Sequence, residues 1–379
     1  LRAFAREGTV RWTQPDVSGS GSPLIAPDEA VLVWQGLGLT SVDPAGVIRW
    51  QRILTDFLPG VVDMAVSDQG LIVAAGSFGI RALDLAGNLQ WSVWDEPYVS
   101  VVLDADQTVN ATPQHGRQVR SFSPAGELRW SAGPGVFSGG LALAGPGQLL
   151  APGSDAVLRR FNPQGEVTWS RTLDAGAGEP LRLPDGLLVA TGATQLLILD
   201  TAGATTAQTG LIPGPMALAD DGTVLVGSRG RLMALDAGGA VLWTYELTRT
   251  NDFFHGTLLA PDGRLILSVR DAIQVLQSTL RPAATGWHTQ RANPRRSGQW
   301  LLPGDVHPRL MGIARRGDGE LLIGTKAPIG VEADLEHSTD WQTWTAVGQV
   351  QGQGTVTKVV VPLPGTPAGA YRLRTRPEP

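Results

Sequence analysis

The strongest constraint on the fold is a short motif that recurs along the chain at nearly constant spacing. In residues 41–50 it reads SVDPAGVIRW, a turn sequence followed by alternating residues that end in tryptophan. Seven copies, including a degenerate one that ends in Ala207, end at positions 12, 50, 91, 130, 169, 207 and 243. Neighbouring ends are 36–41 residues apart. A period near 40 with several short strands per repeat is typical of β-propeller blades.

Each repeat has room for four short strands joined by tight turns. Residues 63–91 contain two apolar runs, a third run after Gly79 and a last one that ends in Trp91, with turn residues between them. The 48 Gly and 27 Pro of the chain favour many turns over long helices. We therefore predict an all-β fold of four-stranded antiparallel blades.

The turn before the last strand of each repeat is specified by its own residues. Pro44 presets φ, Asp43 can cap the turn, and Gly46 can adopt the left-handed conformation. Alternation then places the residues two and four positions after the glycine on one face, which we expect to be buried between blades. The predicted apolar partners are Val10, Ile48, Leu89, Leu128, Val167 and Val241. The predicted structural pegs are Trp12, Trp50, Trp91, Trp130, Trp169 and Trp243.

The two ends of the repeat region complement one another. The first copy begins at its fourth strand, and the last repeat, residues 257–277, supplies only three strands. Pairing of residues 9–14 with these three strands would remove an exposed edge, so we predict a seven-bladed propeller over residues 1–280 with terminal strand closure. We expect the chain, which begins at Leu1, to be a processed product, and an eighth blade before Leu1 is the alternative that stays open.

Two further regions follow the ring. Residues 281–302 form a connector that combines Trp287 and Trp300 with three arginines, Arg291, Arg295 and Arg296. These arginines are a weak footprint for nucleic acid in a chain of net charge -5, so we expect a structural connector and no nucleic-acid partner. Residues 303–379 alternate without the blade motif, which predicts a small β-sandwich.

The repeat pattern LD-x-x-G-x-h-x-W, where h is apolar, resembles the quinoprotein-like (PQQ-like repeat) β-propeller family over residues 1–280. The stretch 287–298, WHTQRANPRRSG, is similar to a segment that often accompanies such propellers in bacterial proteins. Residues 335–344 together with 370–374 are similar to fibronectin-III-like modules. The resemblance implies a bacterial extracytoplasmic protein, periplasmic or extracellular, that acts as a scaffold.

The residues argue against the best-known chemistry of that family. The chain has no cysteine, whereas the quinone alcohol dehydrogenases are expected to carry a vicinal disulfide against the cofactor. The five histidines have no metal-ligand spacing. We predict no catalytic residue, no metal site and no cofactor; a degenerate quinone-dependent dehydrogenase or other sugar-acting propeller enzyme, with PQQ and calcium, is the alternative. No apolar run is long enough to span a bilayer.

The binding site is predicted in the loops that connect each last strand to the next innermost strand, because these loops converge on one mouth of the channel. They are mildly acidic and aromatic, which suits a protein or glycan partner. An alternative is that the phenylalanines merely plug the channel. The predicted binding residues are Asp56, Phe57, Asp95, Tyr98, Phe137, Glu179, Asp252, Phe253 and His255.

Overall fold

The structure is a computed structural model of the 379-residue chain. It describes residues 1–5, 8–17, 23–35, 38–53, 61–77, 79–114, 118–133, 140–174, 178–182, 188–228, 230–247, 254–260, 263–269, 272–280, 282, 309–316, 320–326, 332–338, 343, 345–351, 356–362 and 370–375. The described chain divides into two compact units, Leu1–Trp300 and Leu301–Pro379.

The first unit contains six four-stranded antiparallel blades, in each of which consecutive strands are hydrogen-bonded neighbours. The strands of the first three blades are β3 (Leu24–Ile25), β4 (Val31–Gln35), β5 (Gly38–Val42), β6 (Ile48–Ile53); β7 (Val61–Val66), β8 (Ile72–Gly76), β9 (Gly79–Leu83), β10 (Leu89–Val93); and β11 (Tyr98–Leu103), β12 (Val109–Pro113), β13 (Val119–Phe122), β14 (Leu128–Ala132). Those of the next three are β15 (Ala142–Gly145), β16 (Gln148–Pro152), β17 (Val157–Phe161), β18 (Val167–Thr172); β19 (Leu181–Arg182), β20 (Leu188–Thr191), β21 (Gln195–Leu199), β22 (Thr205–Gly210); and β23 (Met216–Leu218), β24 (Val224–Ser228), β25 (Arg231–Leu235), β26 (Val241–Glu246).

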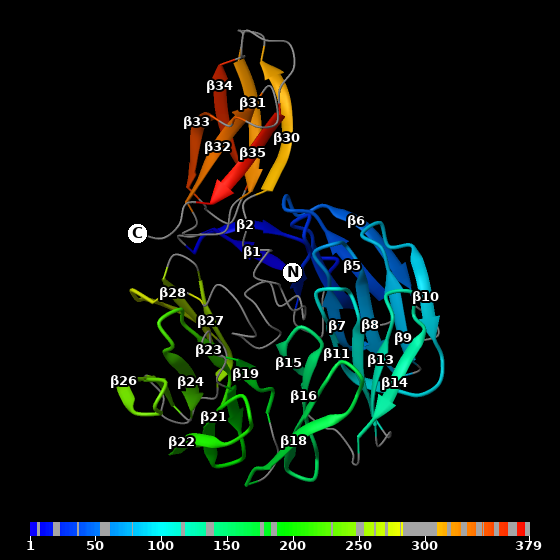
Figure 1. The fold of residues 1–379 in the computed structure, drawn as a ribbon, viewed down its shortest axis with the longest axis vertical. Helices are drawn as coiled ribbons and strands as arrows, with labels where there is room; N and C mark the ends of the chain where they lie inside the picture. Colours follow the sequence, from blue (N-terminus) through cyan, green and yellow to red (C-terminus); the bar gives the residue numbers. More distant parts are fainter. Residues whose placement is uncertain are drawn as a thin grey trace. The chain divides into compact units, whose positions relative to one another are not determined.

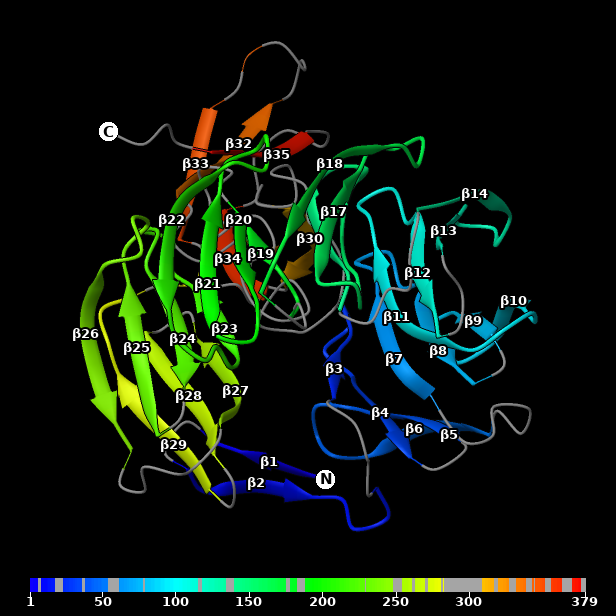
Figure 2. The same ribbon diagram turned by 90° about the horizontal axis from the view of Figure 1, so that it is seen from below.

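Successive blades follow one another around a ring, from the blue β3–β6 to the green β23–β26 (Figures 1 and 2). The first strands are innermost, because β7 contacts both β3 and β11, and β19 contacts both β15 and β23. The apolar core lies between the sheets. In one such layer Val73 and Ile80 pack with Val101 and Phe122 of the next blade. Burial of these side chains is the main favourable contribution to closing the ring.

The prediction of seven blades is wrong: in the described chain there are six four-stranded blades and two incomplete sheets. β27 (Phe254–Leu259), β28 (Arg264–Val269) and β29 (Ala272–Gln277) form a three-stranded sheet. β2 (Val10–Thr13), predicted as its fourth strand, pairs instead with β1 (Arg2–Phe4). The hairpin β1–β2 lies between β27–β29 and β3–β6 in the ring (Figures 1 and 2). β1 was not predicted from the sequence, and its pairing satisfies the backbone of one edge of β2 locally.

The repeated tryptophans contact the turn of the following sheet. The Trp50 ring lies 2.9 Å from where a Cβ on Gly87 would stand, and Gly87 has a φ of +78°. The indole Nε1 of Trp50 donates a hydrogen bond to the Leu85 carbonyl at 2.7 Å. The same pair of contacts joins Trp12, Trp91, Trp130 and Trp169 to Gly46, Gly126, Gly165 and Gly203, with acceptor carbonyls on Pro44, Pro124, Pro163 and Thr201.

The apolar residues two positions before these tryptophans are not buried, contrary to the sequence prediction. Val10, Leu89, Leu128, Val167 and Val241 are exposed. A β-bulge in each last hairpin explains the difference: Ile48 pairs with Val42, whereas Trp50 pairs with the adjacent Ser41. The extra residue disturbs the alternation of side chains, so the tryptophan and the apolar residue do not share one buried face.

The second unit contains two three-stranded antiparallel sheets, β30-β31-β34 and β33-β32-β35. Its strands are β30 (Arg309–Arg316), β31 (Glu320–Lys326), β32 (Glu332–Ser338), β33 (Thr345–Gln351), β34 (Val356–Pro362) and β35 (Ala370–Thr375). Buried Ala333 and Val350 pack with Val359. The sandwich arrangement, the likeness to fibronectin III and the boundaries of the connector 281–302 stay predictions; within that connector only Pro282 is described.

Candidate functional site

One fully described loop of the predicted kind connects β10 to β11 and comprises residues 94–97. It runs from the outer strand of one blade to the innermost strand of the next, as do the corresponding loops of the other blades. Arg81 of β9 and Arg120 of β13 contact side chains of this loop and of the residue that follows it. These side chains are Trp94, Asp95 and Glu96 of the loop and Tyr98 of β11. We call these six residues the β10–β11 loop cluster.

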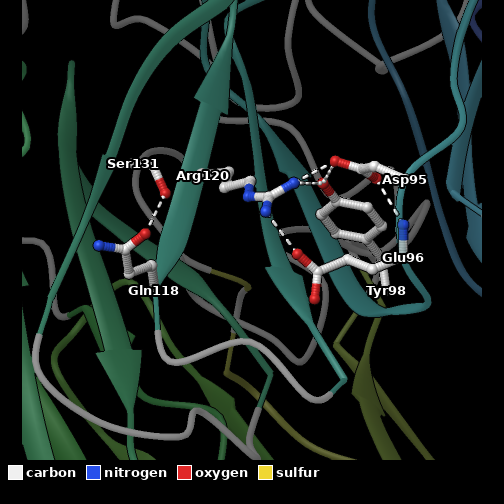
Figure 3. Close-up of polar contacts among 6 residues, drawn as sticks. All are labelled: Asp95, Glu96, Tyr98, Gln118, Arg120 and Ser131. Atoms are coloured by element: carbon white, nitrogen blue, oxygen red, sulfur yellow. Dashed lines mark hydrogen bonds and ion pairs between the residues drawn. The ribbon is translucent and has the colours of Figure 1, made fainter.

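Arg120 holds the acidic part of the cluster together (Figure 3). Its guanidinium forms an ion pair with Asp95, a second one with Glu96 at 2.5 Å, and a hydrogen bond to the Tyr98 hydroxyl at 2.9 Å. The Tyr98 hydroxyl in turn donates to Asp95 at 3.2 Å. The two carboxylates are only partly covered, with 36% and 23% of their side chains exposed. They therefore offer oriented, partly accessible acceptors.

Tyr98 is the fixed base of this arrangement. Its side chain is fully buried, and its ring meets Phe122 edge to face at a centroid distance of 6.4 Å. Burial, and then the negative charge of Asp95, raise the pKa of Tyr98 far above its usual range, although Arg120 acts in the opposite direction. The phenol consequently keeps its proton and acts as a hydrogen-bond donor to Asp95.

Arg120 remains a cation in spite of its partial burial. Desolvation acts to lower the pKa of Arg120, but the attraction of Tyr98, Asp95 and Glu96 outweighs it and the pKa is raised. Beside it, Ser131 donates a hydrogen bond to the Gln118 side chain at 2.7 Å, which orders the end of β13 and β14 (Figure 3). The ion-pair network is thus built on two paired strands.

Trp94 supplies the apolar part of the cluster. Its side chain is 51% exposed, and the guanidinium carbon of buried Arg81 lies 4.5 Å from its ring centroid. Its indole nitrogen donates to the Ser92 hydroxyl at 2.8 Å. Gly79, at φ +141°, allows the backbone of β9 to approach Val93 at the start of the loop, since a Cβ on Gly79 would stand 1.8 Å from the Val93 carbonyl oxygen. A cation under the ring fixes an indole whose remaining surface faces solvent.

The innermost strand below the cluster is tied to the preceding and following blades. Asp63 of β7 accepts a hydrogen bond from the Val101 amide at 2.9 Å. Ser100 accepts one from the Leu141 amide at 3.2 Å. These bonds hold β11 between its neighbours, so the loop that precedes it starts from a rigid base.

The structure brings only some of the predicted site residues together. Asp95 and Tyr98 lie in one network, and buried Tyr98 has no surface to offer a partner. Glu179 lies in another loop, where it packs against Gly140 of the preceding blade. His255 lies in β27, without a described side chain. Outside the described residues lie Asp56, Phe57, Phe137, Asp252 and Phe253.

Sequence reasoning missed the arginines of the cluster, although a signal was present. Arg81, Arg120 and Arg159 occupy the same position of the third strand in three consecutive blades, each 39 residues after the last. Arg159 is also buried and pairs with Asp155 at 2.5 Å. An arginine that recurs with the blade period, at a position where the other blades carry an uncharged residue, identifies a part of the ring that differs from the rest.

The described residues contain no group of three or more histidine, cysteine or acidic side chains arranged to hold a metal ion. No helix among them is long and apolar enough to cross a membrane.

The comparisons with known proteins agree with this architecture. The PQQ_2 family model, described as "Outer membrane protein assembly factor BamB", matches residues 154–301. The matched part of the propeller, residues 154–301, is of the PQQ-like repeat type. No curated protein matches the chain. The PQQ-like propeller shares its fold with BamB from Moraxella catarrhalis, at 15% identity and a TM-score of 0.58 over 81% of this chain and 93% of that one.

Two further solved structures have the same fold. The computationally designed Ika8 protein is 12% identical, with a TM-score of 0.60 over 72% of this chain and 87% of that one. The C-terminal WD40 domain of Sif2 is 10% identical, with a TM-score of 0.58 over 80% and 93%. At these identities the likeness concerns the fold of the propeller.

Proposed function

We propose that the PQQ-like propeller is an extracytoplasmic scaffold that holds a protein partner through the loops at one mouth of its ring. Half-exposed Trp94, fixed by Arg81 and flanked by carboxylates that Arg120 orients, is the observation that carries the proposal. An aromatic anchor beside oriented polar groups is the usual composition of a binding hot spot. The match to a model described as an assembly factor supports a protein partner over a glycan.

The cluster is suited to binding and poorly suited to catalysis. Tyr98 keeps its proton, and both carboxylates are engaged by Arg120, so the cluster presents no general base. A partner segment that places an apolar side chain on Trp94 and a backbone amide or cation near Asp95 and Glu96 matches its chemistry. The proposal extends to equivalent loops through Asp56, Phe57, Phe137, Glu179, Asp252, Phe253 and His255.

Site-specific photo-crosslinking in the organism that makes the protein tests this function. A photoreactive amino acid at position 94 should yield a discrete crosslinked adduct, because the loop is in contact with the partner. The matched control is position 128 on the outer strand β14, where Leu128 is similarly exposed, at 56%. Adducts of equal yield at both positions, or none at position 94 in a properly folded protein, would refute the proposal.

Once the adduct has been identified, Trp94→Ala measures the contribution of the anchor. We expect it to weaken binding of the purified partner by about tenfold to a hundredfold, in the range of an aromatic hot spot. The melting temperature should stay nearly unchanged, because the ring is largely exposed. An unchanged affinity would place the partner elsewhere on the propeller.

A further inference from the structure

The three-stranded sheet β27–β29 is exposed where the complete blades are covered. In those blades the third strand pairs with a fourth along its outer edge and is buried. β9 is buried along its whole length, and β21 along all but its first residue. In β29 the equivalent strand has Ile273 63% exposed and Val275 52% exposed. This sheet therefore presents an apolar strand that its fold normally covers.

The preceding blade, β23–β26, independently has a tryptophan that no following turn covers in the described chain. Trp91 and Trp130 each lie on a turn glycine and donate to a carbonyl of the next blade. Trp243, at the same repeat position in β26, is 36% exposed, and all six residues of β26 are exposed. Among the described residues, none accepts a hydrogen bond from its indole nitrogen. The described residues place no strand in the sheet beyond β29 and no turn glycine on Trp243.

The described parts of the chain that adjoin β29 lead away from its edge. The Ser278 amide and hydroxyl both donate to the Gly263 carbonyl, at 2.9 and 2.8 Å. Pro282 then forms a bridge with Ala219, which belongs to the first hairpin of the preceding blade. The repeat-like strand at the other end of the chain, β2, pairs with β1 in a separate two-stranded sheet.

We propose that the edge of β29 and the ring of Trp243 together accept an extended segment of a partner protein, which adds as a fourth strand. The six complete blades show what fits this position: an antiparallel strand preceded by a turn whose carbonyl accepts from the tryptophan. Strand addition of this kind gains affinity from backbone hydrogen bonds and specificity from alternate side chains. Residues 272–277 carry no charge, so the incoming strand is uncharged or apolar where it faces them.

A partner segment fits this surface better than a second copy of the chain. Two copies joined only through their six-residue β29 strands would bury far less than the roughly 1,200 Å² that stable interfaces require. A flexible segment needs no larger complementary surface, because each of its backbone groups is used. This site is separate from the β10–β11 loop cluster and does not depend on its function.

A peptide with the sequence of residues 121–132, SFSPAGELRWSA, is a suitable probe because it contains the turn and fourth strand of the blade β11–β14. Fluorescence anisotropy with the full chain should show saturable binding, and hydrogen exchange of residues 272–277 should slow on binding. The control peptide carries Leu128→Pro and Trp130→Pro, which remove strand donors. It should not bind.

Variants of the full chain locate the binding. Val275→Lys places a charge on the exposed face and should weaken the peptide at least about tenfold. Leu128→Lys in the protein, on the exposed outer strand β14, should leave the affinity unchanged. If circular dichroism shows that Val275→Lys does not fold, Ile273→Lys replaces it. Trp243→Ala tests the contribution of the indole ring to peptide binding.

Three results would overturn the proposal. One is the absence of peptide binding at millimolar concentration. Another is binding that Val275→Lys, Ile273→Lys and Trp243→Ala all leave intact. The third is a concentration-dependent dimer that Val275→Lys abolishes, which would assign the edge to a second copy of the chain.

Discussion

Five of the six repeated tryptophans contact the turn that precedes the last strand of the next sheet in the ring. Trp91 is half-buried because its ring lies on Gly126 and its indole donates to the Pro124 carbonyl at 2.8 Å. Trp243 occupies the same repeat position with no such turn in the described chain. The same amino acid in the same motif therefore has two environments, which makes the pair a direct measure of the contact between blades.

Replacement of Trp91 or Trp243 by alanine should separate the stability that comes from the turn contact from the stability that the tryptophan supplies without it. We expect Trp91→Ala to lower the free energy of unfolding by about 2–4 kcal/mol, through lost burial and one lost hydrogen bond. Trp243→Ala should cost about 1 kcal/mol or less, because its ring has no turn above it. Urea unfolding followed by circular dichroism measures both; equal losses would show that the turn contact does not matter.

Individual residues also show where sequence reasoning stops. The capping role of Asp43 could be predicted, and its carboxylate does accept from the Ala45 and Val47 amides at 2.9 and 2.8 Å. This chemistry lies within one turn. The burial of Tyr98 could not be predicted, because the Phe122 and Arg120 side chains that surround it come from β13, beyond an intervening hairpin.

At the scale of elements, adjacent blades are joined by a buried carboxylate as well as by the tryptophans. Asp104, in the turn after β11, accepts hydrogen bonds from the Ala105 amide at 2.7 Å and from the Gly147 amide of the next blade. Burial raises the pKa of Asp104 despite these two bonds, with a further contribution from the charge of Asp106. The carboxylate therefore binds a proton more tightly in the folded chain than in the unfolded one.

This difference predicts a specific pH dependence. A folded pKa above the unfolded value of about 4 means that Asp104 destabilises the fold increasingly as pH rises from there, up to the folded pKa. Asp104→Asn removes that titration. The stability of the wild type relative to this variant should accordingly be greater at pH 4 than at pH 7, as measured by urea unfolding. A difference that does not change with pH would contradict the assignment.

The strand pattern could largely be predicted from the repeat, since the turn glycines and the spacing of the tryptophans lie within one blade. The number of complete blades could not be predicted, because it depends on how the strands at the two ends of the repeat region pair. β2 has the sequence of a fourth strand, yet it pairs with β1 through Ala3 and Trp12. The β-bulge opposite Val42 also escaped prediction, since it appears only in the register between strands.

At the scale of the whole molecule, the two compact units should unfold separately. Residues Leu1–Trp300 and Leu301–Pro379 have distinct sheets and distinct cores. Independent units give separate cooperative transitions rather than one. Calorimetry should therefore show two transitions, and Trp91→Ala should lower the temperature of one only. A single two-state transition, shifted as a whole by Trp91→Ala, would show that the units are coupled.

The contact between blades also bears on how such a ring changes during evolution. Trp50, Trp91, Trp130 and Trp169 meet turns of one chemistry, a glycine preceded by an accepting carbonyl. The last strand of one of these four repeats is therefore compatible with the turn that another of them meets. An in-frame duplication or loss of one of these repeats would keep the tryptophan-to-turn contact at the remaining junctions between them, so lineages can alter the circumference of the ring without inventing a new interface.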